Sequence, residues 1–115
     1  MSTAEMSEVV LAADEVTDCA ARSLGPEAPN VANTVLLEHA GSYAGVLQIP
    51  AGQTIPSHQH RSMAHHLWVL HGCARALGRI LPQGSYWFVP PGHPHSVEGL
   101  PPTGCKLFYV DVPER

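Results

Sequence analysis

Prolines and glycines interrupt this sequence so often that only short elements fit between them. Eleven prolines and ten glycines are spread over 115 residues. Proline cannot continue a helix, and glycine weakens one. The apolar runs between these residues are short and bounded by turn residues, which is typical of strands. The pattern therefore predicts an all-β chain of short strands joined by tight turns.

The expected strands follow one another along most of the chain. They are residues 9–12, 35–38, 46–49, the histidine-bearing segments around 54–60 and 65–72, then 85–89, 95–97 and 106–112. Residues 74–77 are expected to pair back as a hairpin, and residues 78–84 to form a loop. The first strand has a helical alternative, whose apolar positions would be Met6, Val9, Ala13, Val16 and Ala20. We favour the strand.

Length and composition predict one globular domain spanning residues 1–115, with residues 1–8 as a frayed tail. Hydrophobic residues make up 44% of the chain and charged residues 14%, which is typical of a folded domain with a core. Many short strands joined by Gly/Pro turns favour a double-sheet jelly-roll barrel.

Charge and cysteine content indicate which partners the chain is not expected to bind and in which cell compartment it is expected. The formal net charge is −4, so the chain has no electrostatic footprint for nucleic acid or for an anionic membrane. The first residues lack the basic and apolar regions of a signal peptide, and no apolar stretch approaches transmembrane length. Three cysteines without C-x-x-C spacing suggest reduced thiols and a cytoplasmic protein.

Residues 52–72 contain five of the eight histidines. His58 and His60 are two positions apart, so on a strand both side chains would point to the same face. His65 follows a short bend and opens a second apolar run, which allows three imidazoles to meet. Neutral imidazole is a common ligand of Zn, Cu, Fe and Ni. A metal site is therefore one interpretation, and a surface cluster of histidines is the other.

A fourth histidine completes a pattern that resembles the cupins. Their first motif is G-x5-H-x-H-x4-E-x6-G, and their second is G-x5-P-x-G-x2-H-x3-N. The positions of this chain that match the two motifs are Gly52, His58, His60, Gly72, Gly84, Pro90, Gly92 and His95. His65 stands where the family has Glu, and Gly99 stands where it has Asn.

The resemblance implies a cupin barrel, the double-stranded β-helix, with a metal held by His58, His60, His65 and His95. Fe²⁺ is the expected metal, and Zn²⁺, Mn²⁺ or Ni²⁺ are alternatives. The remaining histidines are expected to lie away from the metal; they are His39, His66, His71 and His93.

Alternation along the second histidine-bearing segment predicts which side chains face the barrel interior. His65, Leu67 and Val69 would point inward, and Trp68 and Leu70 would point outward. Large apolar side chains are costly to leave in water, so we expect a second surface to cover them. Cupins commonly dimerise, and the expected partner is a second copy of the chain.

The histidine at position 65 changes the charge of the expected site. Three imidazoles and one carboxylate around a divalent ion leave a net charge of about +1, whereas four neutral imidazoles leave about +2. The more positive site would favour a small anionic substrate such as the enolate of a β-dicarbonyl or a hydroxyketone. Residues 86–88, Tyr-Trp-Phe, were candidates for part of an apolar pocket around it.

Within the cupins, the motifs of this chain are similar to those of the acetylacetone and dihydroxyacetophenone dioxygenases. The likeness implies an Fe(II) enzyme that uses O₂ to cleave a C–C bond next to a carbonyl. Two alternatives remain open. One is a Zn-dependent enzyme similar to polyketide cyclases, and the other is a non-catalytic cupin that binds a metal or a small molecule, like the metal-binding module of certain anti-sigma factors.

Overall fold

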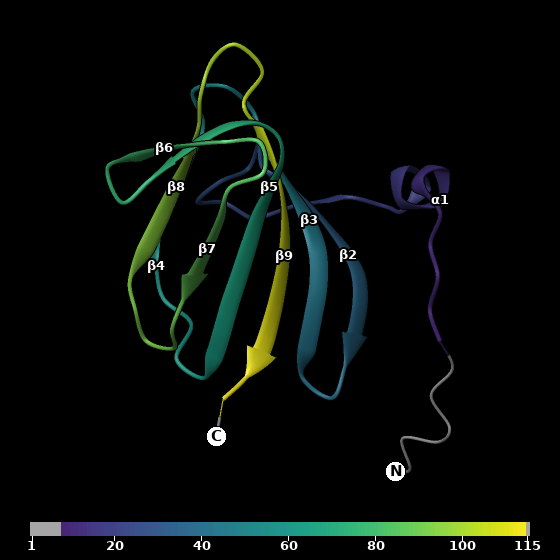
Figure 1. Ribbon diagram of the computed structural model, residues 1–115. Coiled ribbons are helices and arrows are strands. Elements are labelled where there is room, and N and C mark those ends of the chain that lie inside the picture. The colour runs from purple at the N-terminus through teal and green to yellow at the C-terminus, as the bar shows by residue number, and fades with distance from the viewer. Residues whose placement is uncertain (1–7, 115) are drawn as a thin grey trace.

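The computed structural model describes residues 8–114, which form a jelly-roll barrel of antiparallel strands with one short helix (Figure 1). The all-β prediction is confirmed. The elements are α1 (Ala13–Asp18), β1 (Arg22–Ser23), β2 (Ala32–His39), β3 (Ser42–Ile49), β4 (Thr54–His58), β5 (Met63–Ala76), β6 (Arg79–Pro82), β7 (Tyr86–Val89), β8 (His95–Gly99) and β9 (Cys105–Pro113).

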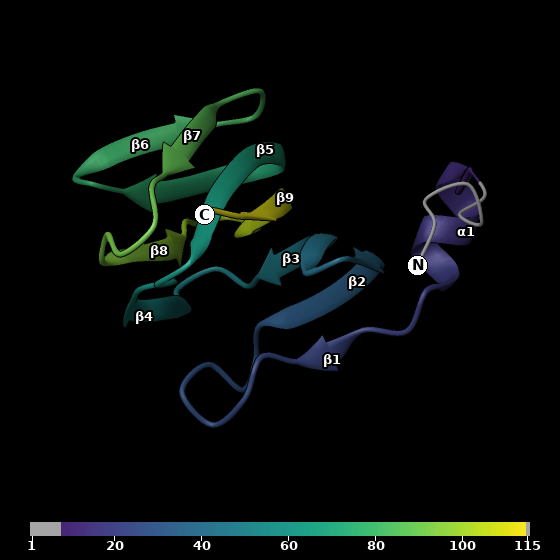
Figure 2. The same ribbon diagram turned by 90° about the horizontal axis from the view of Figure 1, so that it is seen from below.

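Strand β5 connects the two walls of the barrel. Its first part pairs with β9 on one side and with β7 on the other, and the wall continues from β9 through β3 and β2 to β1. Its last part pairs with β6 and β8, and β8 pairs with β4. Figure 2 shows β4 and β8 set apart from β2 and β3, with β5 between them. The interior therefore lies between walls that share one long strand.

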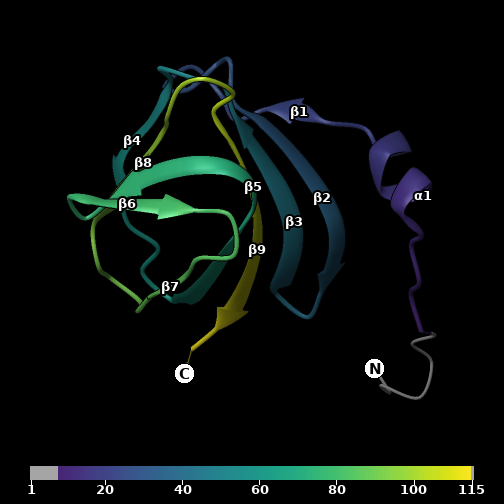
Figure 3. The same ribbon diagram turned by 45° about the horizontal axis from the view of Figure 1, so that its top comes forward.

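Gly72 allows β5 to bend from one wall into the other. The register between β5 and β9 shifts between Val69 and His71, and Gly72 has a φ of 76°. A bulge and a glycine with positive φ turn a strand without ending it. We expected Gly72 to close its strand, but β5 continues to Ala76; Figure 3 shows the bend, beyond which β5 runs beside β6.

Two further expectations about local structure are wrong. Residues 79–82, expected in a loop, form β6, because Leu77 and Gly78 both have positive φ and make the two-residue turn of a hairpin. Residues 9–12 are not a strand; they lead into α1, and Val9 and Val10 are exposed by 54% and 79%. No described strand pairs with them.

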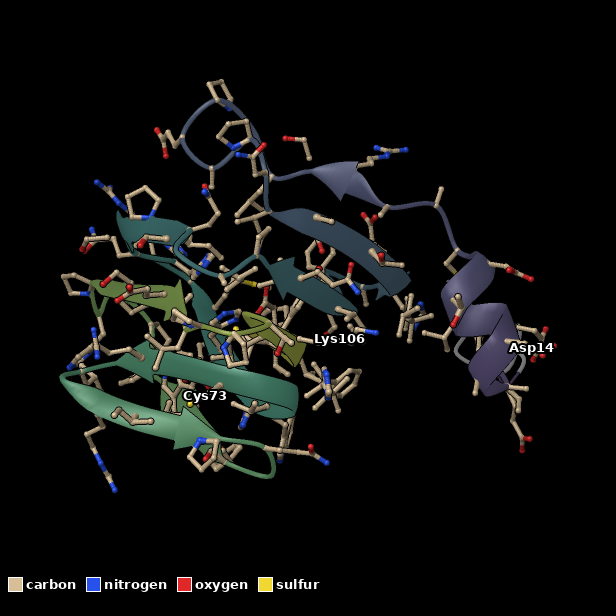
Figure 4. The ribbon with its side chains drawn as sticks, turned by 90° about the horizontal axis from the view of Figure 1, so that it is seen from above. Asp14, Cys73 and Lys106 are labelled. Atoms are coloured by element: carbon tan, nitrogen blue, oxygen red, sulfur yellow. The ribbon has the colours of Figure 1, made fainter. Side chains whose placement is uncertain are left out.

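Helix α1 fits the helical alternative only in part. It covers residues 13–18, while Met6 and the expected frayed tail fall on residues 1–7, outside the described part of the chain. The helix buries no residue, and Figure 4 shows Asp14 on it, away from the strands. No helix among residues 8–114 is long and apolar enough to cross a membrane.

The core confirms the predicted alternation along β5. Leu67 and Val69 are almost fully buried, and they pack with Ile49 and Leu107 from β3 and β9. Their neighbours face outward, as predicted. We call the outward aromatic and apolar group the outer face; its members are His66, Trp68, Leu70, Tyr86, Phe88 and Phe108.

The aromatic side chains of the outer face pack against one another but remain open to solvent. The ring of Trp68 lies 5.0 Å from that of Tyr86 and 5.7 Å from that of Phe108. Leu70 and Phe88 are each exposed by 45%. An exposed apolar group of this kind is where we expect an interaction surface.

We expect Gly72→Ala to destabilise the fold more than Gly78→Ala. Both glycines have positive φ, which disfavours alanine by about 1–2 kcal/mol. A Cβ at Gly78 meets open space, whereas one at Gly72 would overlap the carbonyl oxygen of Gly104. The Cys73 N–H donates to that oxygen at 3.0 Å, so the loop cannot retreat freely, and overpacking adds about 1–3 kcal/mol. Denaturant unfolding of the two variants compares them; equal losses would contradict the steric explanation.

We propose that the outer face pairs with a second copy of the chain. Trp68→Lys should then weaken the dimer, because it places a charge among aromatic side chains at the interface. Leu77→Lys is the control, since Leu77 is exposed by 79% at a hairpin tip. Sedimentation at micromolar concentration measures both variants and the parent. A monomeric parent, or a Trp68→Lys variant as dimeric as the control, would contradict the proposal.

Candidate metal centre

Four histidines reach the barrel interior, three from separate strands and one from the bend after β4. His58 ends β4, His60 follows it in the bend, His65 lies near the start of β5, and His95 begins β8. His58 and His95 are direct partners in the pairing of β4 with β8, so their side chains lie on the same face. All four line one cavity of about 140 Å³.

His58, His60 and His95 form the most compact group. One ring nitrogen from each lies within 4.8 Å of those from the other two. The ring centroid of His58 lies 5.0 Å from that of His60 and 4.1 Å from that of His95. The centroids of His60 and His95 are 5.2 Å apart. Three of the four predicted ligands therefore meet in a geometry that could hold an ion.

Backbone carbonyls orient two of these imidazoles. Nδ1 of His58 lies 2.9 Å from the carbonyl oxygen of Pro56, and Nδ1 of His95 lies 3.3 Å from that of His93. A carbonyl can only accept, so each Nδ1 carries the proton and donates, and each Nε2 keeps a free lone pair. This is the tautomer that a metal-binding histidine needs.

Two ring nitrogens in the cluster are buried without a hydrogen-bond partner among residues 8–114. They are Nε2 of His60 and Nε2 of His95. A buried polar atom left unpaired costs free energy, and such atoms in native structures call for an explanation. A metal ion accepting both lone pairs would supply the missing interaction.

Burial favours the neutral form of two imidazoles of the cluster, those of His60 and His95. Desolvation lowers the pKa of His95 to about 4. Desolvation also lowers the pKa of His60, and the neighbouring His65 adds to the effect. Neutral imidazole is the form that coordinates a metal, so at neutral pH these histidines do not need to lose a proton to bind one.

His65 faces the same group but is held differently. It is exposed by only 6%, and its ring centroid lies 4.9 Å from His60 and 5.3 Å from His95. Its Nδ1 contacts the Oδ1 atom of Asp111 on β9. The ring is therefore turned into the cavity and not toward solvent. Its coordination of a metal stays a prediction.

Three polar residues of the cavity were not among the candidate site residues predicted from the sequence. They are Asp111, Tyr109 and Asn33. Alternation along the expected strand 106–112 could have revealed two of them, because Leu107, Tyr109 and Asp111 share its inward face. The hydroxyl of Tyr109 donates to Oδ1 of Asn33 at 2.8 Å, which leaves the amide NH₂ of Asn33 as a donor.

The aromatic segment 86–88 does not line the cavity, contrary to the expectation. Tyr86 and Phe88 point to the outer face, while Trp87 packs against the core. The apolar lining comes instead from Leu24, Leu47, Ile55, Leu67 and Val97. Strand alternation explains the orientation of two of the three residues, because Phe88 and Tyr86 lie opposite the outward His66 and Trp68 of β5. Trp87 lies opposite the inward Leu67.

His66 lies outside the cluster, as predicted. Its Nδ1 is 2.8 Å from the hydroxyl of Tyr86 on the outer face. His93 is exposed in the turn before β8 and contributes its carbonyl oxygen to the orientation of His95.

Comparison with known proteins identifies a family. A family model described as the ChrR cupin-like domain matches residues 12–113. A search of curated protein sequences found no match.

Several solved structures share the fold. A chain from the complex of Rhodobacter sphaeroides SigE with the anti-sigma ChrR is 24% identical, with a TM-score of 0.71; the match covers 83% of this chain and 50% of that chain, so this chain spans half its length. The polyketide cyclase RemF from Streptomyces resistomycificus is 20% identical, with a TM-score of 0.75 and coverage of 92% and 78%. An RmlC-like cupin from Ralstonia eutropha is 16% identical, with a TM-score of 0.78 and coverage of 98% and 73%. At these identities the similarity shows the fold alone.

Proposed function

Because the chain belongs to the ChrR cupin-like domain family, we propose that it is a metal-binding cupin whose histidine cluster holds a divalent transition metal. The observation that carries the proposal is the pair of buried Nε2 atoms, on His60 and His95, that have no hydrogen-bond partner. His58 completes the compact group, and His65 is the fourth proposed ligand.

The donor set fits the metals expected from the sequence. Imidazole suits Fe, Zn and Ni, and availability decides among metals that a nitrogen site accepts. Fe²⁺ is the proposed metal, with Zn²⁺, Mn²⁺ or Ni²⁺ as alternatives. Such an ion would supply Lewis-acid polarisation of a bound oxygen atom and, as Fe²⁺, access to O₂ chemistry.

The proposed activity is dioxygenase cleavage of a small β-dicarbonyl or hydroxyketone. A cavity of about 140 Å³ is close to one that holds benzene, which is about 150 Å³. A substrate of that size would fit the cavity, and the apolar side chains that line it would pack against the substrate. The amide NH₂ of Asn33, whose oxygen accepts from Tyr109, would donate a hydrogen bond to a substrate oxygen.

A second candidate is a non-catalytic module that binds a metal or a small molecule. The family description and the similarity to a chain of the SigE–ChrR complex favour it. In that case the ligand in the cavity would control binding to a partner protein, and no substrate would be turned over.

The first test is the metal content of the purified and reconstituted protein. We expect about one ion per chain, as a single coordinated site provides. His58→Ala and His95→Ala should lose most of it, because each removes a donor. His66→Ala is the control, since that imidazole lies on the outer face. A parent that retains none of the four metals, or a His95→Ala variant that binds like the parent, would refute the proposal.

The second test separates the enzyme from the non-catalytic module. Fe²⁺-loaded protein with verified metal content should consume O₂ when acetylacetone is added, with loss of the diketone. Zn²⁺-loaded protein should not, because Zn²⁺ has no redox chemistry. An oxygen electrode follows the reaction. If the Fe²⁺ form binds acetylacetone and consumes no oxygen, the dioxygenase activity is wrong and the binding module remains.

A further inference from the structure

We infer that Asp111 is a positioning residue of the metal centre. Through its contact with His65, it holds that imidazole turned into the cavity, and it supplies the negative charge that a Glu ligand supplies in the cupin motif. The inference rests on the proposed metal-binding function and assigns a role within it to a residue outside both sequence motifs.

The contact between His65 and Asp111 is part of the sheet. The two residues are direct partners in the pairing of β5 with β9, so their side chains project on the same face of adjacent strands. Nδ1 of His65 contacts Oδ1 of Asp111, and their side chains are exposed by only 7% and 14%. A hydrogen bond built into a buried ladder is held far more tightly than a contact between mobile surface side chains.

The charge of Asp111 is not balanced by a lysine or arginine. Among residues 8–114, its one basic partner is the imidazole of His65, while the other acid–base pair joins Arg75 to Glu98. No lysine or arginine lines the cavity. Burying a carboxylate costs several kcal/mol unless a positive charge offsets it. A cation at Nε2 of His65 would offset it through the imidazole.

The carboxylate also selects the tautomer of His65. An ionised carboxylate only accepts hydrogen bonds, so Nδ1 of His65 must donate and Nε2 keeps its lone pair. The carbonyl oxygens of Pro56 and His93 select the same tautomer for His58 and His95. Three imidazoles from three strands thus keep a lone pair on Nε2, although the groups that accept from their Nδ1 atoms differ.

This arrangement revises the charge expected from the sequence. Four neutral imidazoles around a divalent ion leave about +2, but the Asp111 carboxylate in contact with one of them lowers the total to about +1. That is the charge of a site with three histidines and one carboxylate. The His65–Asp111 pair would therefore carry the same net charge as the Glu ligand of the motif. Its carboxylate would contact the imidazole of His65 and not the metal.

The test measures metal affinity and the geometry of the site in Asp111→Asn. Asparagine keeps the size of the side chain and removes its charge. Competition with a chromophoric chelator should show Co²⁺ and Zn²⁺ affinities lowered about 10–100-fold, the range for lost partners of ligating histidines. The visible spectrum of the Co²⁺ form should change as well. Glu98→Gln is the control, because Glu98 is paired with Arg75 outside the cavity and should bind metal like the parent.

A double-mutant cycle separates positioning from a general structural effect. If Asp111 acts through His65, Asp111→Asn should lower metal affinity in the parent and leave it unchanged in a His65→Ala background. Thermal unfolding checks that each variant folds; should Asp111→Asn not fold, Asp111→Ser takes its place with the same expected loss.

Two results would overturn the inference. One is an affinity in the Asp111 variant equal to that of the parent, and the other is an equal loss with and without His65. A parent that binds neither Co²⁺ nor Zn²⁺ would overturn the proposed function itself, and this inference with it. The failure of the two ideas is therefore distinguishable.

Discussion

The pairing of β5 with β9 is the interaction on which the rest of the structure depends. Its ladder runs from Met63 to Gly72 on β5. On its inner side it aligns Leu67 and Val69 with Tyr109 and Leu107, which form much of the core. The same register places His65 opposite Asp111. One set of backbone hydrogen bonds therefore determines both the packing of the barrel and the contact behind one imidazole of the proposed metal centre.

Much of the fold and of the histidine cluster could be predicted because local patterns encode them. Alternation along β5 correctly separates the inward Leu67 from the outward Trp68, and motif spacing brings His58, His60 and His95 together. The prediction that a strand ends at Gly72 was wrong, because a glycine with positive φ ends a strand in one context and bends it in another. The pairing of neighbouring strands decides between the two, and a single sequence does not show that pairing.

Asp111 could not be connected to the site from the sequence because their contact is long-range. It lies 46 residues from His65, and only the register between β5 and β9 brings the two together. Counting ligands along the first motif therefore leaves out a carboxylate that, in the proposed metal centre, would lower the charge by about one. The substitution of His for Glu at position 65 is better understood together with Asp111, as a pair, than as the loss of a carboxylate.

The cluster is held in place by groups other than a metal, and this limits how far binding must reorganise it. Backbone carbonyls of Pro56 and His93 fix two rings, and a carboxylate fixes a third. Binding then carries little entropic cost for ordering these side chains. Yet the buried Nε2 atoms of His60 and His95 lack partners, which costs stability in the absence of an ion. Because an ion would bind the folded chain more tightly than the unfolded one, the same lone pairs that weaken the barrel would couple metal binding to its stability.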